Sequence, residues 1–440
     1  MPGPIQMLVK AEHNMKKADK KPKTIFFFGH FGSPNFGNEI TLQTALYHVR
    51  CLLPEAEVAC ICTGPEALAA TQKIETVPIS RSFVKPGKRR SRSARLLRKV
   101  FIAAPSEFCR WFETFNTLRR ADMLIIPGTG LLTDAYGLMA WGPYNLFKWS
   151  LIASVCRCKV LFVSVGAGPV YSALGKYFVK SALSLADFRS YRDKASLEYL
   201  KGIGFSTNSD RIYPDLVFSL PEAMLPHHGD RRGKRSIVGL GVMPYAGKYS
   251  VAKPSDVTYR KYLESLVTFV RWLLMHDYDI RLLTGEVSDS SASAEFRFLL
   301  KISLGHYDEN RIIDQPALSA EQLLPQIAGT DIVVATRFHN ILLGLVLNKP
   351  VISISFHHKC ASLMKEMGLS EYCQDINHMN GDRLIEQFQD LERNAEKLKP
   401  VIRRNVEQSR KALDEQYNFI FGTCVRTPGT KETVLTQNES

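Results

Sequence analysis

The chain has 440 residues, of which 45% are hydrophobic and 23% are charged. These proportions are typical of a globular protein, and the length exceeds what one hydrophobic core organises, so we expect two domains. No stretch of the sequence approaches the ~20 consecutive apolar residues that span a bilayer. The formal net charge of +14 predicts anionic partners.

Much of the basic excess lies in one segment, Lys85 to Lys99, which holds eight Lys or Arg residues and no acidic residue. No aromatic residues interleave with these cations, so the segment does not favour nucleic acid as a partner. Loose contact with an anionic membrane fits the charge, and so does a solvated basic loop.

The first 23 residues are polar and contain no continuous apolar stretch of the kind found in a secretory signal. We expect them to form a disordered lead-in. The nine cysteines lack zinc-finger or CxxC redox spacing, which favours buried, reduced thiols. These features predict a cytoplasmic protein, with the basic segment allowing a peripheral position at the inner face of the membrane.

Strand, glycine turn and helix recur along the first half of the chain. An apolar run at 24–28 predicts a strand, the glycine-rich turn 29–39 follows it, and helical spacing begins at residue 40. Further predicted elements are strands at 57–62, 121–126, 159–165 and 188–191, and helices at 105–120, 143–157, 175–186 and 194–201. Such repeats indicate a parallel sheet covered by helices.

The second half repeats the pattern after a polar, basic stretch that we interpret as a linker, 226–236. We therefore predict an N-terminal Rossmann-like domain at 24–225, a C-terminal one at 237–421 and a flexible tail at 422–440. The expected strands are 237–242, 279–284, 332–335 and 351–355, and the expected helices are 259–276, 295–304, 321–328, 341–347 and segments between 381 and 421.

The segment from Asp331 to Lys359 contains two closely spaced strand-to-helix junctions with cationic or titratable side chains. Arg337 and His339 follow the first strand, and Lys359 follows the second, directly after the pair His357 and His358. Ligands of open parallel sheets bind outside the carboxyl ends of the strands, where a helix N-terminus favours an anion. This segment predicts an anion site with a proton donor beside it, because Arg binds carboxylate or phosphate in a bidentate manner and His titrates near neutral pH.

The glycine turns of the first half let backbone amides approach a ligand. We expect substrate contacts at Asn38 in the first turn, at Gly128 and Gly130 in the second and at Gly168 in the third. Their spacing is not that of a dinucleotide fingerprint.

Several titratable residues of this half have two interpretations. Asp134 follows the second glycine turn and fits a site residue as well as it fits a helix N-cap or a turn residue. His30 is a second acid–base candidate or a structural histidine. Arg192 binds substrate or pairs with Asp193 or another carboxylate of the core.

Five motifs in this order resemble the polysaccharide pyruvyltransferase family: GHFGSPNFGNEITL (29–42), ADMLIIPGTGLLTD (121–134), VSVGAGPV with SYRDKASLEYLKGIGF and YPDLVFSL (163–220), TRFHNILLGL (336–345), and KPVISISFHHKCASLMKEMGL (349–369). The Arg-x-His after a buried strand is the most telling member of the set. The sequence departs from the family at Thr129, where a glycine is common, at His357–His358, and in the basic segment.

The resemblance implies a fold of the α/β class with two Rossmann-like domains facing a cleft, as in GT-B glycosyltransferases. It implies transfer of pyruvate from phosphoenolpyruvate onto two hydroxyls of a sugar, without metal or cofactor. Arg337 and His339 carry over first, then Arg192, Asp193, Lys359 and Asp134. The glycan acceptor, whether lipid-linked, a finished polymer or protein-bound, stays open.

His339 is our candidate general acid, with two alternatives: it pairs with the departing phosphate, or it is a structural histidine at a helix N-terminus. Asp134 or a second histidine is the candidate base. A GT-B glycosyltransferase that uses a nucleotide sugar is the alternative, with Glu286 as the carboxylate near the donor ribose. A non-catalytic anion- or glycan-binding protein is a third interpretation.

Overall fold

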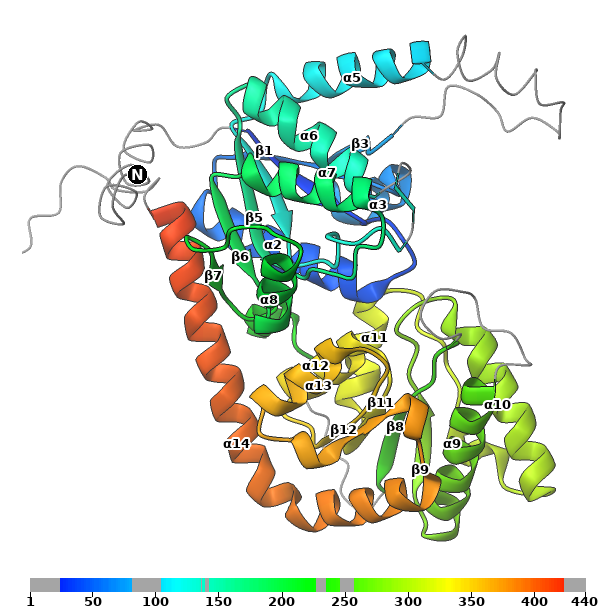
Figure 1. The fold of residues 1–440 in the computed structure, drawn as a ribbon. Helices are drawn as coiled ribbons and strands as arrows, with labels where there is room; N and C mark the ends of the chain where they lie inside the picture. Colours follow the sequence, from blue (N-terminus) through cyan, green and yellow to red (C-terminus); the bar gives the residue numbers. More distant parts are fainter. Residues whose placement is uncertain are drawn as a thin grey trace, which may run out of the picture.

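The computed structural model describes residues 24–80, 104–135, 137–138, 142–226, 235–245 and 257–422. The chain forms two α/β units, each built on a parallel sheet, with one long helix running beside both (Figure 1). The predicted lead-in, the basic segment from Lys85 to Lys99, most of the linker and nearly all of the tail lie outside the described residues.

The first unit holds a seven-stranded parallel sheet with the strand order β3-β2-β1-β4-β5-β6-β7. Its strands are β1 (Thr24–Gly29), β2 (Glu57–Cys62), β3 (Glu75–Pro78), β4 (Met123–Pro127), β5 (Lys159–Val165), β6 (Phe188–Tyr191) and β7 (Arg211–Ile212). Its helices are α2 (Phe36–Leu52), α3 (Pro65–Gln72), α5 (Ala104–Leu118), α6 (Pro143–Val155), α7 (Ala173–Ser184) and α8 (Lys194–Gly202), followed by the short 3-10 helices η2 (Leu216–Ser219) and η3 (Glu222–Met224). The strand order reverses between β1 and β4, which makes their carboxyl ends the switch point where ligands bind.

The second unit holds a six-stranded parallel sheet with the strand order β10-β9-β8-β11-β12-β13. Its strands are β8 (Ile237–Gly241), β9 (Asp279–Leu282), β10 (Ile312–Ile313), β11 (Ile332–Ala335), β12 (Val351–Ser355) and β13 (Cys373–Asp375). Its helices are α9 (Val257–Met275), α10 (Asp289–Leu304), α11 (Ala320–Ala328), α12 (Phe338–Val346) and α13 (His358–Glu366), with the 3-10 turns η4 (Glu309–Arg311), η5 (Ser370–Tyr372) and η6 (Ile376–His378). Here the switch point lies between β8 and β11, so the Arg-x-His motif follows a switch-point strand.

The central strands are buried on both faces, because helices cover each sheet from two sides. β1 and β11, for example, consist almost entirely of fully buried residues. This explains why their sequences are continuous apolar runs rather than alternating patterns. One hydrophobic cluster extends from the first sheet through α2 into the second sheet, so the two units share a core.

The loops at the carboxyl ends of the two sheets touch. The backbone N–H of Phe36 donates to the carbonyl of Gly285 at 3.3 Å, and that of Val287 donates to the carbonyl of Pro34 at 3.1 Å. Asn35 and Glu286 form an isolated antiparallel bridge between them. The glycine-rich turn after β1 therefore lies directly against the loop after β9.

Helix α14 (Gly381–Phe421) begins on the second unit and ends on the first (Figure 1). Near its end, the Gln416 side chain accepts a hydrogen bond from Ser190 Oγ at 2.6 Å and donates one to Ser164 Oγ at 3.1 Å. The sequence pattern assigned this helix to a C-terminal domain of 237–421. The structure adds that its last turns are part of the packing of the first unit.

The predicted strands 57–62, 159–165, 188–191, 332–335 and 351–355 coincide with the observed ones. The short strands β3, β7, β10 and β13 were not predicted, because they lie at the sheet edges and are only two to four residues long. Within the described chain, no helix is both long enough and apolar enough to span a membrane.

Candidate active site at the facing sheet ends

His339 lies in the first turn of α12, where the chain leaves β11. Its Nε2 atom is shielded from solvent and has no hydrogen-bond partner among the described residues. Burial first, and then the positive charges of Lys359, Arg192 and Arg337, hold the pKa of His339 well below its usual value. The imidazole is therefore neutral at neutral pH in the unliganded protein, in a region of positive potential.

Two cations from different units lie close to the ring of Phe338, the residue before His339. The Arg192 guanidinium carbon is 4.9 Å from the centre of the Phe338 ring, and the Lys359 Nζ is 5.3 Å from the same centre. Arg192 follows β6 of the first sheet, whereas Lys359 lies in the first turn of α13 of the second. Folding thus gathers positive charge from both sheets around one histidine, as the sequence predicted in part.

The two cations differ in how their charge is compensated. Arg192 donates to Asp215 at 3.2 Å and lies 3.6 Å from Asp193, and both carboxylates are nearly buried. Lys359 forms no ion pair with a carboxylate of the described residues. Burial and the neighbouring Arg192 lower the pKa of Lys359 to about 8. The pairing of Arg192 with core carboxylates, one of its two interpretations, is observed, and its proximity to His339 keeps it in the candidate site.

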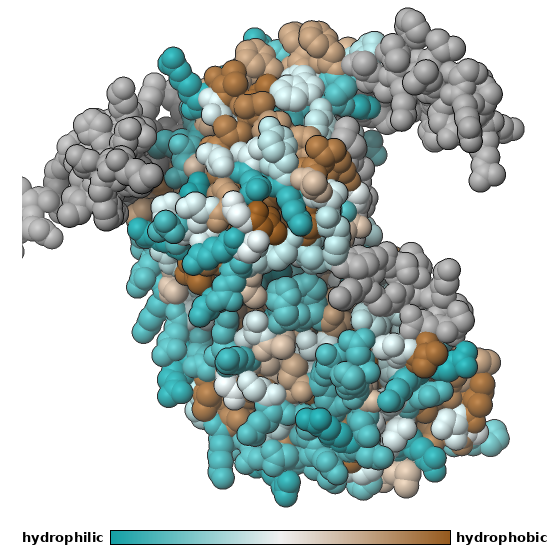
Figure 2. All heavy atoms as spheres, viewed as in Figure 1, coloured by the Kyte–Doolittle hydropathy of each residue, from teal (hydrophilic) through white to brown (hydrophobic). Residues whose placement is uncertain are grey.

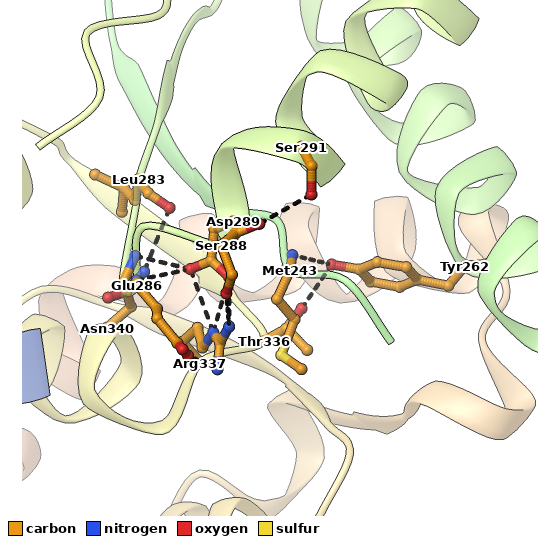
Figure 3. Close-up of polar contacts among 11 residues, drawn as sticks. Met243, Tyr262, Leu283, Glu286, Ser288, Asp289, Ser291, Thr336, Arg337 and Asn340 are labelled. Carbon is orange, nitrogen blue, oxygen red and sulfur yellow. Dashed lines mark hydrogen bonds and ion pairs between the residues drawn. The ribbon is translucent and has the colours of Figure 1, made fainter. Parts of the chain in front are cut away.

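Arg337 is held more tightly than the sequence suggested. Its Nε and Nη2 atoms contact the buried carboxylate of Asp289 at 2.6 to 3.2 Å, and its Nη1 lies 2.8 Å from Glu286 (Figure 3). Asp289 also accepts hydrogen bonds from the backbone N–H groups of Gly285 and Glu286. The guanidinium fork that was expected to bind an anion is engaged by carboxylates of the loop after β9.

The predicted histidine pair lies at the N-terminus of α13. The His357 and His358 ring centres are 4.1 Å apart, and His357 Nδ1 accepts a hydrogen bond from the Lys359 backbone N–H at 3.4 Å. Burial, with the charge of Lys359 second, lowers the pKa of His357 to about 3. Burial also lowers the pKa of His358. Both are neutral neighbours of Lys359 at neutral pH.

The turn after β1 brings His30 and Asn38 together. Asn38 Nδ2 donates to the His30 carbonyl at 3.1 Å, so the amide shapes the turn. Burial lowers the pKa of His30 to about 4. Glu39 accepts hydrogen bonds from the backbone N–H groups of Gly32 at 2.8 Å and Ser33 at 3.3 Å, and burial raises its pKa to about 7.

Gly37 in the same turn packs against the His339 imidazole. A Cβ atom at this position would overlap the ring, so only glycine permits so close an approach of the two units. Gly166 plays the same part for Arg192, because a Cβ there would lie 2.7 Å from the guanidinium Nη2. The first and third glycine turns therefore shape the histidine and cation environment.

Asp134 lies in the loop after β4, and its carboxylate contacts the residues just before α7. Its carboxylate accepts hydrogen bonds from the backbone N–H groups of Tyr171 and Ser172, both at 2.8 Å, and from Ser172 Oγ at 2.7 Å. These contacts occupy both oxygens and hold the residues that lead into α7, whose N-cap is Ser172. The structure thus gives no support to Asp134 as the base.

The three glycines predicted to contact substrate have different surroundings. Gly128 is enclosed by Leu216 and other core atoms, whereas nothing lies within 4 Å of a Cβ built on Gly130. Gly168 has a positive φ of +88° and packs against the Tyr199 ring. Of the three, Gly130 has the open surroundings that a bound sugar needs.

Sequence reasoning missed Asp289, Gly37, Gly166 and Asp215. Asp289 lies in a polar stretch, 288–293, whose sequence fits a turn or a helix cap and gives no sign of the pairing with Arg337. Asp215 and the two glycines belong to the matched motifs, but their roles depend on contacts with distant residues. No group of three or more His, Cys, Asp or Glu residues suited to a metal ion occurs within the described ranges.

Two parallel-sheet units with facing switch points define a GT-B fold, as predicted. Among solved structures the chain is similar to a putative UDP-N-acetylglucosamine 2-epimerase from Listeria monocytogenes, with a TM-score of 0.59, 11% identity and coverage of 90% of this chain and 95% of that one. It is also similar to the UDP-GlcNAc 2-epimerase from Neisseria meningitidis (TM-score 0.57, 10% identity, 92% and 100% covered) and to a glycosyltransferase from Rickettsia africae (0.54, 12%, 93% and 100%). At these identities the similarity concerns the fold alone.

Residues 35–358 match the family model of polysaccharide pyruvyl transferases, and the chain belongs to that family. A curated relative is the amylovoran biosynthesis protein AmsJ of Erwinia amylovora, 22% identical over 320 residues, which cover 70% of this chain and 74% of AmsJ. The predicted resemblance is confirmed, and family membership makes the protein a transferase of polysaccharide biosynthesis.

Proposed function

We propose that the protein transfers pyruvate from phosphoenolpyruvate onto two hydroxyls of a glycan sugar, forming a cyclic ketal and releasing phosphate. The observation that carries this proposal is the set of cations from both units around His339. Family membership agrees with it. Glu286, the residue that a nucleotide-sugar reading would require, is paired with Arg337, so nothing specific favours that alternative.

Phosphoenolpyruvate carries a phosphate and a carboxylate, and the site supplies matching positive charge. Lys359 has no carboxylate partner among the described residues, so an anion is the counter-ion that its position lacks. The N-terminus of α12 has no side-chain cap from Arg337, which leaves its first N–H groups available for an anion. Arg192 adds a second cation that Asp215 and Asp193 hold in place.

Arg337 supports this arrangement from the side. Its guanidinium is fixed by Asp289 and Glu286, so it adds positive potential and sets the start of α12. We propose that Arg337 contacts the anion only if substrate displaces Glu286, which is the less buried of its two carboxylate partners.

The reaction begins with a proton delivered to the methylene carbon of phosphoenolpyruvate. That carbon gains a C–H bond, its neighbour becomes electron-poor, and the first sugar hydroxyl adds there and loses its proton. The second hydroxyl then displaces phosphate. Of the two hydroxyl protons, one balances the proton in the new methyl group and the other leaves with inorganic phosphate.

His339 is the proposed proton donor. The neutral imidazole of the unliganded protein must gain a proton, and the negative charge of bound phosphoenolpyruvate raises its pKa toward the range needed for acid catalysis. Binding and protonation are therefore coupled. His30, in the turn that faces His339 through Gly37, is the proposed second acid–base group.

The first unit supplies the proposed acceptor wall. Gly130 has open space beside it, while Gly128 and Gly168 set the path of the neighbouring turns. Asn38 holds the turn that carries His30. We propose that the sugar bearing the two hydroxyls lies along these turns, with its reacting oxygens toward His339.

The test is to incubate the protein with phosphoenolpyruvate and acceptors terminated in galactose, glucose or mannose. Phosphate release that depends on acceptor, together with the mass gain of a pyruvate ketal on the glycan, is the expected result. UDP- and GDP-sugars serve as matched donors. Glycan extension with a nucleotide sugar, and no phosphate release from phosphoenolpyruvate with any acceptor, would replace the proposal with a glycosyltransferase.

A further inference from the structure

Helix α5 presents an apolar stripe to solvent. Phe108, Phe112 and Phe115 are 75%, 60% and 39% exposed, and their spacing of four and three residues places them on one face. Arg119, also exposed, follows four residues later, just beyond the end of the helix. A surface helix normally turns such a stripe toward the core, but α5 packs Trp111 and Leu118 inward and leaves the three phenylalanines exposed.

Polar contacts with α6 fix the orientation of α5. Glu107 accepts hydrogen bonds from Tyr144 Oη at 2.7 Å and from the buried Lys148 at 3.1 Å, and Trp111 Nε1 donates to Tyr144 Oη at 3.0 Å. These groups anchor the inner face of α5 on α6. Turning the phenylalanines inward would leave the Lys148 ammonium buried without its partner, which is strongly unfavourable.

The neighbouring helices α6 and α7 carry an aromatic surface of their own. Tyr144 packs against Phe178 with ring centres 5.5 Å apart, and Phe178 stacks on Phe147 at 5.4 Å. Tyr177, 57% exposed, borders this surface on α7. Figure 2 shows apolar residues gathered over α5 and the helices beside it. Exposed apolar surface on this scale marks an interaction site rather than ordinary surface.

We propose that α5 docks the first unit on the interface of a membrane rich in anionic lipid, with the three phenylalanine rings inserted among the lipid headgroups. The charge of the chain selects this occupant. Arg119 lies on the stripe itself, and the sequence just before α5 carries the eight cations of the Lys85 to Lys99 segment without an acid. Anionic headgroups attract such a surface, whereas a second copy of the chain, with the same charge, is repelled.

Apolar side chains together with cations in the adjoining sequence are the combination that gives stable but reversible interfacial binding, because neither term alone suffices. Docking in this way tethers the protein to a membrane, where a lipid-linked glycan would be found. The docking inference itself does not depend on the identity of the donor.

The test is co-sedimentation of the full chain with vesicles. Wild type is expected to bind equimolar phosphatidylcholine and phosphatidylglycerol, to bind phosphatidylcholine alone much more weakly, and to be released by high salt. The triple variant Phe108→Ser/Phe112→Ser/Phe115→Ser is expected to lose roughly tenfold or more in its vesicle partition coefficient. The matched control is Phe298→Ser/Ile302→Ser, which removes two exposed apolar side chains from α10 of the second unit and leaves vesicle binding unchanged.

A positive readout of insertion comes from Phe112→Trp. Lipids brominated in their acyl chains should quench the added fluorescence relative to the wild-type protein. Because the changed side chains are exposed, each variant should keep the melting temperature of the wild type, which checks that folding is intact.

Three outcomes would overturn the proposal. The first is wild type that does not bind the anionic vesicles. The second is a triple variant that binds them as wild type does. The third is wild type that is dimeric in solution and a triple variant that is monomeric, with vesicle binding equal in the two, which would assign the stripe to a second copy of the chain.

Discussion

Two neighbouring strand-to-helix junctions of the second sheet each hold a cation, but in different electrostatic settings. After β11, Arg337 is paired with Asp289 and Glu286. After β12, Lys359 has no carboxylate partner among the described residues and has a pKa lowered to about 8. A cation that is already neutralised organises the protein, whereas one without a counter-ion is ready to receive an anionic ligand.

The difference follows from the loops that face each junction. The loop after β9 delivers the buried Asp289 to Arg337, with its backbone N–H groups holding the carboxylate in position. Lys359 instead faces Arg192 and the neutral pair His357 and His358. The arginine of the Arg-x-His motif is therefore already paired, and Lys359 is the proposed anion contact.

The largest expected effect tests the histidine between the two cations. We predict that His339→Gln lowers kcat by roughly 10²- to 10⁴-fold, the usual contribution of a general acid. The dissociation constant of phosphoenolpyruvate, measured by calorimetry, should change little. His306→Gln, an exposed position on the same unit, is the matched control. Turnover within a factor of two of wild type would remove His339 from the chemistry.

The second prediction concerns the ion pair between Arg337 and Asp289. Asp289→Ala leaves the Arg337 guanidinium without its buried partner and is expected to destabilise the protein by about 3 kcal/mol or more. Denaturant unfolding of the second unit measures the effect. Glu309→Ala, which removes an exposed ion pair with Lys301, should cost less than about 1 kcal/mol. Equal losses in the two variants would contradict the structural role of Asp289.

The contact between the two units gives the third prediction. In Gly37→Ala the new methyl group overlaps the His339 ring, and a displacement on the order of 1 Å is expected to lower kcat/KM by about 10²-fold. Gly202→Ala is the control, because its Cβ meets nothing within 4 Å. If Gly37→Ala retains full activity, the close approach of the first turn to His339 is not needed for the reaction.

The unpaired cation gives the fourth. Lys359→Met removes one charge from the anion site and is expected to raise the KM for phosphoenolpyruvate by about 10- to 100-fold, as for loss of a charge-assisted hydrogen bond. Lys365→Met, an exposed position on the same helix, should leave the KM unchanged. A fall in kcat with no rise in KM would assign Lys359 to chemistry rather than to binding.

The smallest effect is in pH dependence. Because the pKa of Lys359 in the free protein is about 8, the side chain is charged below that pH and neutral above it. The affinity for phosphoenolpyruvate should therefore fall as pH rises through about 8, by at most about tenfold per pH unit. Lys359→Met should abolish that limb of the profile. A wild-type affinity that is flat between pH 7 and pH 10 would contradict the lowered pKa.

Local patterns in the sequence determined a large part of this protein. Continuous apolar runs predicted the central strands, since a strand buried on both faces has no alternation to display. The order of the glycine turns and the Arg-x-His motif indicated the family, and the position of these motifs after strands indicated where the site lies. His339, Lys359 and Arg192 were all identified in this way.

Tertiary structure alone decided which charges meet. Arg337 and Asp289 are 48 residues apart, and Gly37 and His339 lie in different units, so no local period relates them. The same holds for α5. Its apolar stripe predicts a surface that faces the core, but the ion pair between Glu107 and the buried Lys148 holds the opposite face of the helix against α6. The spacing of apolar residues follows the local backbone geometry and can be read from neighbouring residues. Counter-ions and close contacts depend on how distant segments pack.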